Sequence, residues 1–158
     1  MKIRLLALDV DGVLTDGGVY YSPKGEELVK FNRQDGMGIS LLKKAGVEVA
    51  LISGEDSDCT RRRAEKLGIS EVYLGIKDKE TVLREISKRL GIPLEEIAFI
   101  GDDVNDLPPL NLVGLPMTVA NGVPAVKEVA KHILERHGGD GAVREAADYI
   151  LALNRAFH

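Results

Sequence analysis

This sequence contains little that would cross-link or anchor a chain. Tryptophan is absent, Cys59 is the only cysteine, and aromatic residues make up 4% of the 158 residues. A single cysteine excludes an internal disulfide and favours a reducing compartment. No apolar run approaches the roughly 20 residues of a membrane span, and no signal-peptide pattern follows the basic start. We therefore expect a cytoplasmic protein without a membrane partner.

An excess of positive charge is also missing. The chain has 21 Lys and Arg against 25 Asp and Glu, giving a net charge of −4 at pH 7. This balance leaves no basic footprint for nucleic acid. The composition, 44% hydrophobic and 29% charged, is that of a globular protein, and the length suits one domain over residues 1–158. Any phosphate must then be bound by a few local groups or a metal.

Short β-prone segments alternate with helical patterns along the chain. This alternation is typical of an α/β fold with a doubly wound parallel sheet, which binds ligands at the carboxyl ends of its strands. Asp35 and Asp78 are the predicted N-caps of two of the helices. The predicted strands are 4–8, 47–53, 71–74, 97–101 and 116–120, and the predicted helices are 35–44, 56–67, 78–90 and 141–153.

Residues 17–32, GGVYYSPKGEELVKFN, interrupt this alternation. Two β-prone runs surround the turn signal at 22–25, which predicts a small β-hairpin. Its tyrosines and aliphatic residues are apolar for a projection, and such a patch often marks an interface. A hairpin folded onto the chain's own sheet is the alternative.

Acidic residues follow two of the apolar strands. Asp9 and Asp11 are two residues apart, so in extended backbone they point to one side. Two neighbouring carboxylates repel unless a cation joins them or one is protonated. The segment 98–106, AFIGDDVND, supplies a second acidic group. Oxygen ligands of this kind suit Mg²⁺. The acids of the second group are Asp102, Asp103 and Asp106, of which Asp106 could also serve only as a helix N-cap.

Two further strand ends offer groups that bind phosphate. Ser53 contributes a hydroxyl after the second strand, and Lys79 contributes a positive charge at the start of a helix. Lys77 is the rival cation for the same role, although most lysines are simply solvated.

These four motifs, in this order, resemble the haloacid dehalogenase superfamily. The resemblance implies that Asp9 is a nucleophile that forms an aspartyl-phosphate, and that Asp11 is the general acid and base. It further implies three groups of supporting residues. Asp9, Asp102 and the backbone carbonyl of Asp11 would bind Mg²⁺, Asp103 and Asp106 would support the site, and Ser53 and Lys79 would bind the phosphoryl oxygens.

Spacing leaves no room for a cap domain. Only 43 residues separate Asp9 from Ser53, and 22 separate Lys79 from Asp102. The capless subgroup that the chain resembles dephosphorylates 3-deoxy-2-keto sugar acids and forms homotetramers around its hairpins. There a C-terminal segment reaches a neighbouring site. By this resemblance the tail, 137–158, would act in trans, with a mobile glycine loop and with Arg144 binding substrate.

The substrate within that subgroup depends on a few residues. Octulosonate-specific members commonly have Arg where this chain has Glu55, whereas relatives acting on 2-keto-3-deoxynononate 9-phosphate have Glu there and Lys at position 66. Arg63, Lys66 and Glu55 are therefore candidate substrate-binding residues, with ordinary surface charge as the alternative. We expect the eight-carbon 3-deoxy-D-manno-octulosonate 8-phosphate of lipopolysaccharide biosynthesis, with the nine-carbon sugar as the runner-up.

Two functions of another class compete with an enzyme. A phosphorylated receiver domain also combines Asp, Mg²⁺, Ser or Thr, and Lys, but its lone Asp follows the third strand, where 71–74 ends without an acid. The other is a phosphatase fold used as a regulatory subunit.

Overall fold

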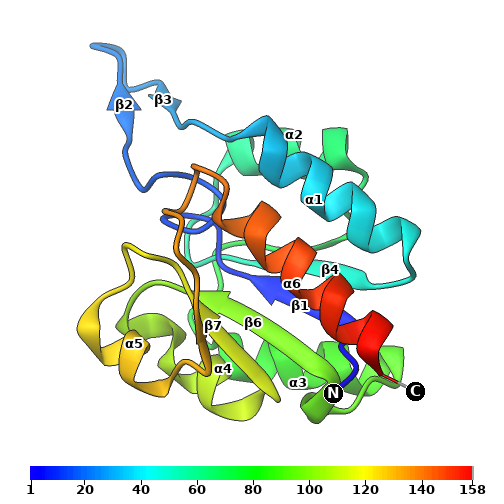
Figure 1. Cartoon of the computed structure of the whole chain (residues 1–158). Coiled ribbons are helices and arrows are strands. Elements are labelled where there is room, and N and C mark those ends of the chain that lie inside the picture. Colours follow the sequence, from blue (N-terminus) through cyan, green and yellow to red (C-terminus); the bar gives the residue numbers. More distant parts are fainter. Residues whose placement is uncertain (158) are drawn as a thin grey trace.

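The computed structural model describes residues 1–157, and a six-stranded parallel sheet forms its centre (Figure 1). The sheet order is β5-β4-β1-β6-β7-β8. β1 lies inside the sheet and all four of its residues are buried, which explains its purely apolar sequence. The strands are β1 (Leu5–Leu8), β4 (Glu48–Ile52), β5 (Glu71–Tyr73), β6 (Ile97–Gly101), β7 (Leu115–Thr118) and β8 (His132–Ile133).

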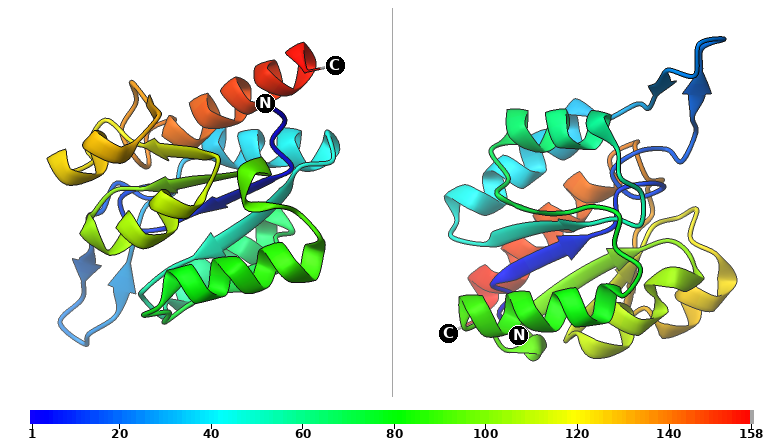
Figure 2. Two further views of the ribbon diagram at one scale, coloured as in Figure 1. Left: turned by 90° about the horizontal axis from the view of Figure 1, so that it is seen from below. Right: turned by 180° about the vertical axis from the view of Figure 1, so that it is seen from behind.

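Helices cover both faces of this sheet, which confirms the doubly wound α/β architecture (Figure 2). One core contains Ile39 of α1, Ala64 of α2 and Ile150 of α6. The other contains Leu83 of α3, with residues of α4 and α5. The α-helices are α1 (Arg33–Lys44), α2 (Asp58–Leu67), α3 (Lys79–Leu90), α4 (Leu107–Leu112), α5 (Pro124–Val129) and α6 (Ala142–Ala156), and the 3₁₀ turns are η1 (Leu94–Glu96) and η2 (Val104–Asp106).

Two elements were not predicted, namely α5 and β8, and α4 was anticipated only as the helix that Asp106 would cap. The two helices have six residues each and the strand has two, which is too short for a hydrophobic period to be read. Both helices start with proline in their first turn, the position that tolerates it. Their packing against the sheet, rather than a local pattern, stabilises them.

The predicted N-cap of α1 was wrong. The side chain of Asn32 accepts the Gln34 N–H at 2.8 Å, so the helix begins at Arg33. Asp35 is fully buried instead, and its Oδ1 accepts the backbone N–H of Arg144 at 3.0 Å. The first turn of α6 has no cap from its own N-cap residue, Gly141. Asp35 therefore caps a helix that lies 109 residues away in the chain. The predicted cap of α3 is confirmed, because Asp78 accepts the Thr81 N–H.

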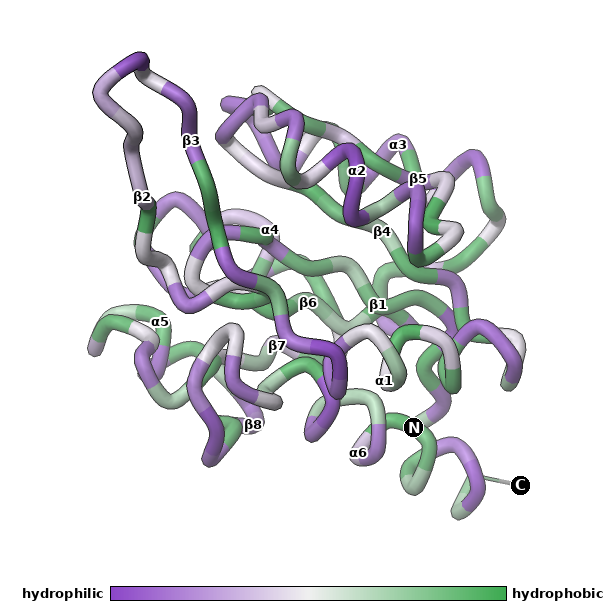
Figure 3. The backbone as a smooth tube through the Cα atoms, turned by 90° about the horizontal axis from the view of Figure 1, so that it is seen from above, coloured by the Kyte–Doolittle hydropathy of each residue, from purple (hydrophilic) through white to green (hydrophobic). Residues whose placement is uncertain are grey.

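The hairpin forms as predicted, from β2 (Tyr20–Tyr21) and β3 (Glu27–Leu28). Its turn is closed by the Gly25 N–H, which donates to the Ser22 carbonyl at 2.9 Å. The two strands make a sheet of their own and project from the body of the molecule (Figure 3). Tyr20, Tyr21 and Leu28 are 64–70% exposed, so the alternative of a hairpin folded onto the central sheet was wrong.

The absence of a cap domain is also confirmed within the described residues. Between the hairpin and Ser53 the chain forms only α1 and β4, and between Lys79 and Asp102 it forms only α3, η1 and β6. None of the helices in residues 1–157 is long and apolar enough to span a membrane. The carboxyl edge of the sheet is thus uncovered by any domain of this chain.

Candidate active site

The acidic residues meet where β1 and β6 end. These strands are parallel neighbours with Leu8 opposite Ile100, so Asp9 and Asp102 emerge at the same edge of the sheet. Asp9 is only 5% exposed. A cavity of about 220 Å³ opens there, lined by Asp9, Asp11, Gly54, Glu55, Asp102, Asp103 and Asn105. Asn105 was not singled out from the sequence, although it lies between two predicted acids.

Lys79 is the buried cation of this site. Its Nζ lies 3.2 Å from Asp9 Oδ1 and 2.7 Å from Asp106 Oδ1, and the residue is 3% exposed. Asp78, as the N-cap, starts α3 at this lysine and so fixes its place. Lys77 is exposed. Of these two lysines, Lys79 is buried against carboxylates and Lys77 is not, so the geometry favours Lys79 as the candidate cation of the site.

Asp106 is not merely a helix cap. It is fully buried, and besides the bond to Lys79 its Oδ2 accepts the Asp102 N–H at 2.9 Å. It makes no side-chain cap bond to α4. A Cβ at Gly101 would lie 2.4 Å from the Asp106 Cβ, so that glycine allows the close approach. Both carboxylate oxygens of Asp106 are thus committed to protein groups.

A cation fits between the remaining acids. Oxygens of Asp9, Asp102 and Asp106 lie within 4.8 Å of one another. Lys79 and a backbone N–H engage both oxygens of Asp106, whereas Lys79 and the Val10 N–H engage only Oδ1 of Asp9, so Asp9 Oδ2 and the Asp102 carboxylate are the candidate ligands. Gly12 has φ +81°, and a Cβ there would lie 2.0 Å from Asp102 Oδ2, so only glycine lets the two loops approach. Carboxylate oxygens of this arrangement suit Mg²⁺ better than zinc.

The electrostatics of these acids favour bound positive charge. Burial raises the pKa of Asp9 to about 8, and the Asp106 charge adds to the rise while Lys79 opposes it. Burial and then the Asp106 charge raise the pKa of Asp102 to about 6. One lysine therefore leaves the cluster short of positive charge, and a divalent cation would supply it.

Asp11 lies at the mouth of the cavity in a different environment. Burial first, and then the charges of Glu55 and Glu27, raise the pKa of its carboxyl. A raised pKa favours a protonated carboxyl, the form that donates a proton to a leaving group. Glu27, on β3, was not predicted, and no local signal could have found it because its position depends on the path of the hairpin.

Ser53 occupies the end of β4 as predicted. It is 1% exposed, its N–H donates to the Tyr73 carbonyl at 2.9 Å, and its Oγ accepts the Glu55 N–H at 3.2 Å. These bonds fix the turn that places Gly54 and Glu55 on the cavity wall.

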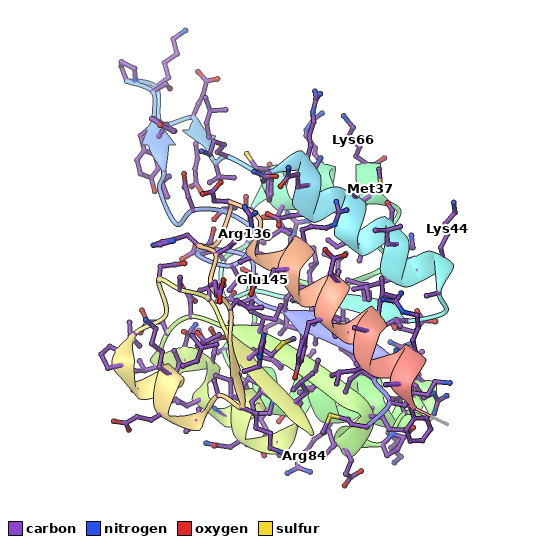
Figure 4. The ribbon with its side chains drawn as sticks, in the orientation of Figure 1. Met37, Lys44, Lys66, Arg84, Arg136 and Glu145 are labelled. Carbon is purple, nitrogen blue, oxygen red and sulfur yellow. The ribbon has the colours of Figure 1, made fainter. Side chains whose placement is uncertain are left out.

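Three predicted substrate-binding residues lie outside this cavity. Arg63 donates to the Asn32 carbonyl at 3.3 Å and its guanidinium lies 5.7 Å from the centre of the Phe31 ring. Arg63 and Lys66 line a separate hollow between α1 and α2, and Lys66 points outward in Figure 4. Arg144 pairs with Asp148 of its own helix, with 3.4 Å between Nε and Oδ2. Of the four candidates, only Glu55 lies in the cavity of its own chain.

The glycine loop before α6 packs closely against the backbone of the Gly12–Asp16 segment of the same chain. A Cβ at Gly138 would lie 1.9 Å from the Gly12 carbonyl oxygen, and one at Gly139 would lie 2.3 Å from the Asp16 nitrogen. The Glu145 carboxylate accepts the Arg136 N–H at 3.0 Å, and Figure 4 shows these two residues together. The glycines are needed because two backbones touch here.

Comparison with known proteins identifies the family. The sequence pattern of the haloacid dehalogenase-like hydrolase family matches residues 55–145. A 3-deoxy-D-manno-octulosonate 8-phosphate phosphatase from Haemophilus influenzae is 44% identical over 150 residues, which cover 95% of this chain and 83% of the relative. This chain belongs to the haloacid dehalogenase-like hydrolases. That membership overturns the receiver-domain alternative.

Solved structures of haloacid dehalogenase-like hydrolases share the whole fold. The 3-deoxy-D-manno-octulosonate 8-phosphate phosphatase from Yersinia pestis superposes with a TM-score of 0.95 at 41% identity, covering 97% of this chain and 83% of that one. The enzyme from Moraxella catarrhalis, solved with magnesium, phosphate and KDO, gives 0.94 at 42% identity, covering 98% and 89%. These similarities include the β1 end with Asp9 and Asp11, which the family pattern does not reach.

Proposed function

We propose that this hydrolase is a Mg²⁺-dependent phosphatase that acts on 3-deoxy-D-manno-octulosonate 8-phosphate in the cytoplasm. The observation that carries the proposal is the cluster of Asp9, Asp102 and Lys79 at one edge of the sheet. The Moraxella relative, whose structure contains magnesium, phosphate and KDO, supports the cofactor and the substrate class. The single cysteine supports the compartment.

In the first step Asp9 attacks phosphorus. A bond forms between an Asp9 carboxylate oxygen and phosphorus, the bond from phosphorus to the sugar oxygen breaks, and the Asp11 carboxyl gives its proton to that oxygen. The environment of Asp11 suits this donation, because burial, Glu55 and Glu27 raise its pKa. Ser53 and Lys79 offset the charge of the phosphoryl oxygens.

In the second step water hydrolyses the aspartyl-phosphate. Asp11, now ionised, takes a proton from water, the oxygen attacks phosphorus, and the bond to Asp9 breaks to release phosphate. Asp9, Asp102 and the backbone carbonyl of Asp11 would hold Mg²⁺, which would neutralise charge on the phosphoryl group. Asp106 and Asp103 support this arrangement, since Asp106 orients Lys79 and the backbone of Asp102.

Recognition of the sugar acid needs groups from outside the cavity of one chain. We propose a homotetramer in which the exposed hairpin side chains, Tyr20, Tyr21 and Leu28, form the contact. In this arrangement the solvent face of α6, within the 137–158 tail, lies over the open site of another subunit while its apolar face stays in the core of its own chain, and Arg144 reaches the substrate carboxylate. Such a lid would exclude water from an otherwise open, capless site.

The nine-carbon 2-keto-3-deoxynononate 9-phosphate remains the second candidate. Glu55 lines the cavity at a position where octulosonate-specific members commonly have Arg. A negative charge in place of a positive one would change the electrostatic environment of the bound sugar. Lys66 and Arg63 line their own hollow between α1 and α2 and would take part only from a neighbouring subunit.

The test is phosphate release from both sugar phosphates and from p-nitrophenyl phosphate, with purified protein and Mg²⁺. We expect the highest kcat/KM for the eight-carbon substrate. Protein carrying Asp9→Asn, prepared identically, controls for contaminating phosphatases. A preference for the nine-carbon sugar would reverse the substrate assignment, and no turnover of any ester would favour the regulatory-subunit alternative.

A further inference from the structure

The turn after β7, residues 119–123, touches both loops that carry the acids. The Asn121 side chain donates from Nδ2 to the Gly12 carbonyl at 3.0 Å and accepts the Gly138 N–H at 2.8 Å. Two residues later, the Val123 N–H donates to the Asp102 carbonyl at 2.9 Å. One short turn therefore holds the backbone next to Asp11 and the backbone of Asp102 at once.

The backbone groups that Asn121 joins depend on it. Gly12 and Gly138 are buried, whereas Asn121 itself is at the surface. Within the described residues, the Gly12 carbonyl and the Gly138 N–H have no other hydrogen-bond partner. Loss of this side chain would leave a donor and an acceptor unsatisfied, or would let the Gly12 loop move to find water.

A movement of the Gly12 loop would directly change the positions of the acids. Gly12 follows Asp11 and packs so closely on Asp102 that any side chain would collide with Oδ2. The Gly139 N–H adds a bond to the Val13 carbonyl at 3.2 Å, which holds the tail behind the same loop. A shift of the Gly12 carbonyl therefore changes the distance between the two loops that hold Asp9 and Asp102.

We propose that Asn121 is a positioning residue that sets the spacing of the Asp9–Asp11 loop and the Asp102 loop, and thereby the affinity for Mg²⁺ and the rate of phosphoryl transfer. It is not among the residues that line the cavity, and it acts through Gly12 and Gly138. The proposal rests on the phosphatase function above but not on the identity of the sugar.

The experiment compares Asn121→Ala with a matched control, Asn154→Ala. Asn154 makes the same pair of bonds, accepting the Ile3 N–H and donating to the Ile3 carbonyl, both at 2.8 Å, but before β1, at the opposite edge of the sheet. Kinetics use p-nitrophenyl phosphate, so that a wrong sugar assignment does not affect them. Mg²⁺ binding is measured separately, without substrate, as the magnesium-induced rise in melting temperature.

For Asn121→Ala we expect kcat to fall and the Mg²⁺ concentration for half-activation to rise, each by about 10- to 100-fold, with KM changed less than about threefold. Asn154→Ala should lower the melting temperature without changing either constant by more than about twofold. Asn121→Asp keeps the acceptor for the Gly138 N–H and removes the donor to the Gly12 carbonyl. It should therefore show the same changes in kcat and Mg²⁺ requirement, and it provides the test if Asn121→Ala does not fold.

Three results would overturn the proposal. These are an unchanged kcat and Mg²⁺ requirement in folded Asn121→Asp, equal kinetic losses in Asn154→Ala, or a loss confined to KM. A different result would count against the proposed phosphatase function instead. In it, the wild-type protein hydrolyses no ester, although Mg²⁺ raises its melting temperature. In that case the Mg²⁺ shift of the variants still tests the spacing role.

Discussion

The candidate residues at the carboxyl edge of the sheet differ from those at the periphery of the molecule in their burial and in whether they contact one another. At the edge, Asp9, Asp106 and Lys79 lie within ion-pair distance and are almost fully buried. At the periphery, Arg63 and Arg144 lie in hollows of their own, and the hairpin tyrosines face solvent. The groups proposed for the chemistry are thus assembled within one chain, whereas most of those proposed to bind the sugar acid lie outside its cavity.

This difference follows from the cost of burying charge. A buried carboxylate needs a partner in the same folded chain, so the catalytic groups are fixed by intramolecular bonds. Arg63 and Arg144 are only half-buried, so the charged ends of their side chains need no buried partner, and the proposed function has them act from a second subunit. The predictions below test first the part built by one chain and then the part that needs a neighbour.

Metal removal should have the largest effect. With EDTA in excess, no phosphate release should be measurable, because Asp9, with its pKa raised to about 8, would stay largely protonated and the phosphoryl oxygens would lose a neutralising charge. Added Mg²⁺ should restore the rate and Ca²⁺ should not, since calcium takes more ligands at longer distances. Steady-state rates with p-nitrophenyl phosphate provide the measurement. Full activity in the chelator would exclude this mechanism.

Substitution of Asp9, the proposed nucleophile, comes next. Asp9→Asn should lower kcat at least about 10³-fold, because the covalent route is closed while the shape of the side chain is kept. Asp58→Asn, an exposed acid at the start of α2, is the matched control and should retain wild-type rates. Single-turnover assays, with mass spectrometry to verify the asparagine, give the answer. Substantial residual turnover would remove Asp9 from the role of nucleophile.

Arg144 tests the contribution of a neighbour. If it binds the substrate carboxylate, Arg144→Ala removes a charged hydrogen bond worth about 1.5–3 kcal/mol and raises KM for the keto-acid phosphate about 10- to 100-fold. The rate with p-nitrophenyl phosphate, which has no carboxylate, should barely change. Light scattering on the same samples records the oligomer. Equal losses on both substrates, or a fully active monomer, would contradict a trans-acting arginine.

The smallest effect concerns stability and pH. Folded Asp9 and Asp102 keep protons up to pKa values of about 8 and 6, whereas the unfolded chain releases them near 3.8. Between these values the unfolded state binds fewer protons, so the free energy of unfolding of the metal-free protein falls as pH rises from about 4 to 8. We expect the melting temperature to fall by a few degrees from pH 5 to pH 8, and saturating Mg²⁺ to raise it most at pH 8.

Asp9→Asn provides the control for that series, since it removes the group with the larger shift and should flatten the pH dependence. If the melting temperature of the metal-free wild type does not change with pH, or if Mg²⁺ raises it equally at pH 5 and pH 8, then folding does not raise the pKa of these carboxyls.

Local patterns were enough to predict five of the six strands of the sheet. Apolar runs that end in acids predicted β1 and β6, and because parallel strands end at one edge, Asp9 and Asp102 were expected to lie together, as they do. The resemblance then supplied roles that geometry alone does not. Boundaries of the long elements moved by only a few residues, because strand burial and helix caps are local signals.

The sequence by itself determined the order of the candidate motifs along the chain. Acids follow β1, Ser53 follows β4, a lysine begins α3, and a second group of acids follows β6. Only the tertiary structure decided that Asp35 caps α6, that Asp106 holds Lys79, and that Glu27 influences Asp11. The physical reason is distance along the chain. Asp35 and Arg144 are 109 residues apart, and such a bond forms only after packing has placed two helices together. No pattern within a few residues can encode it.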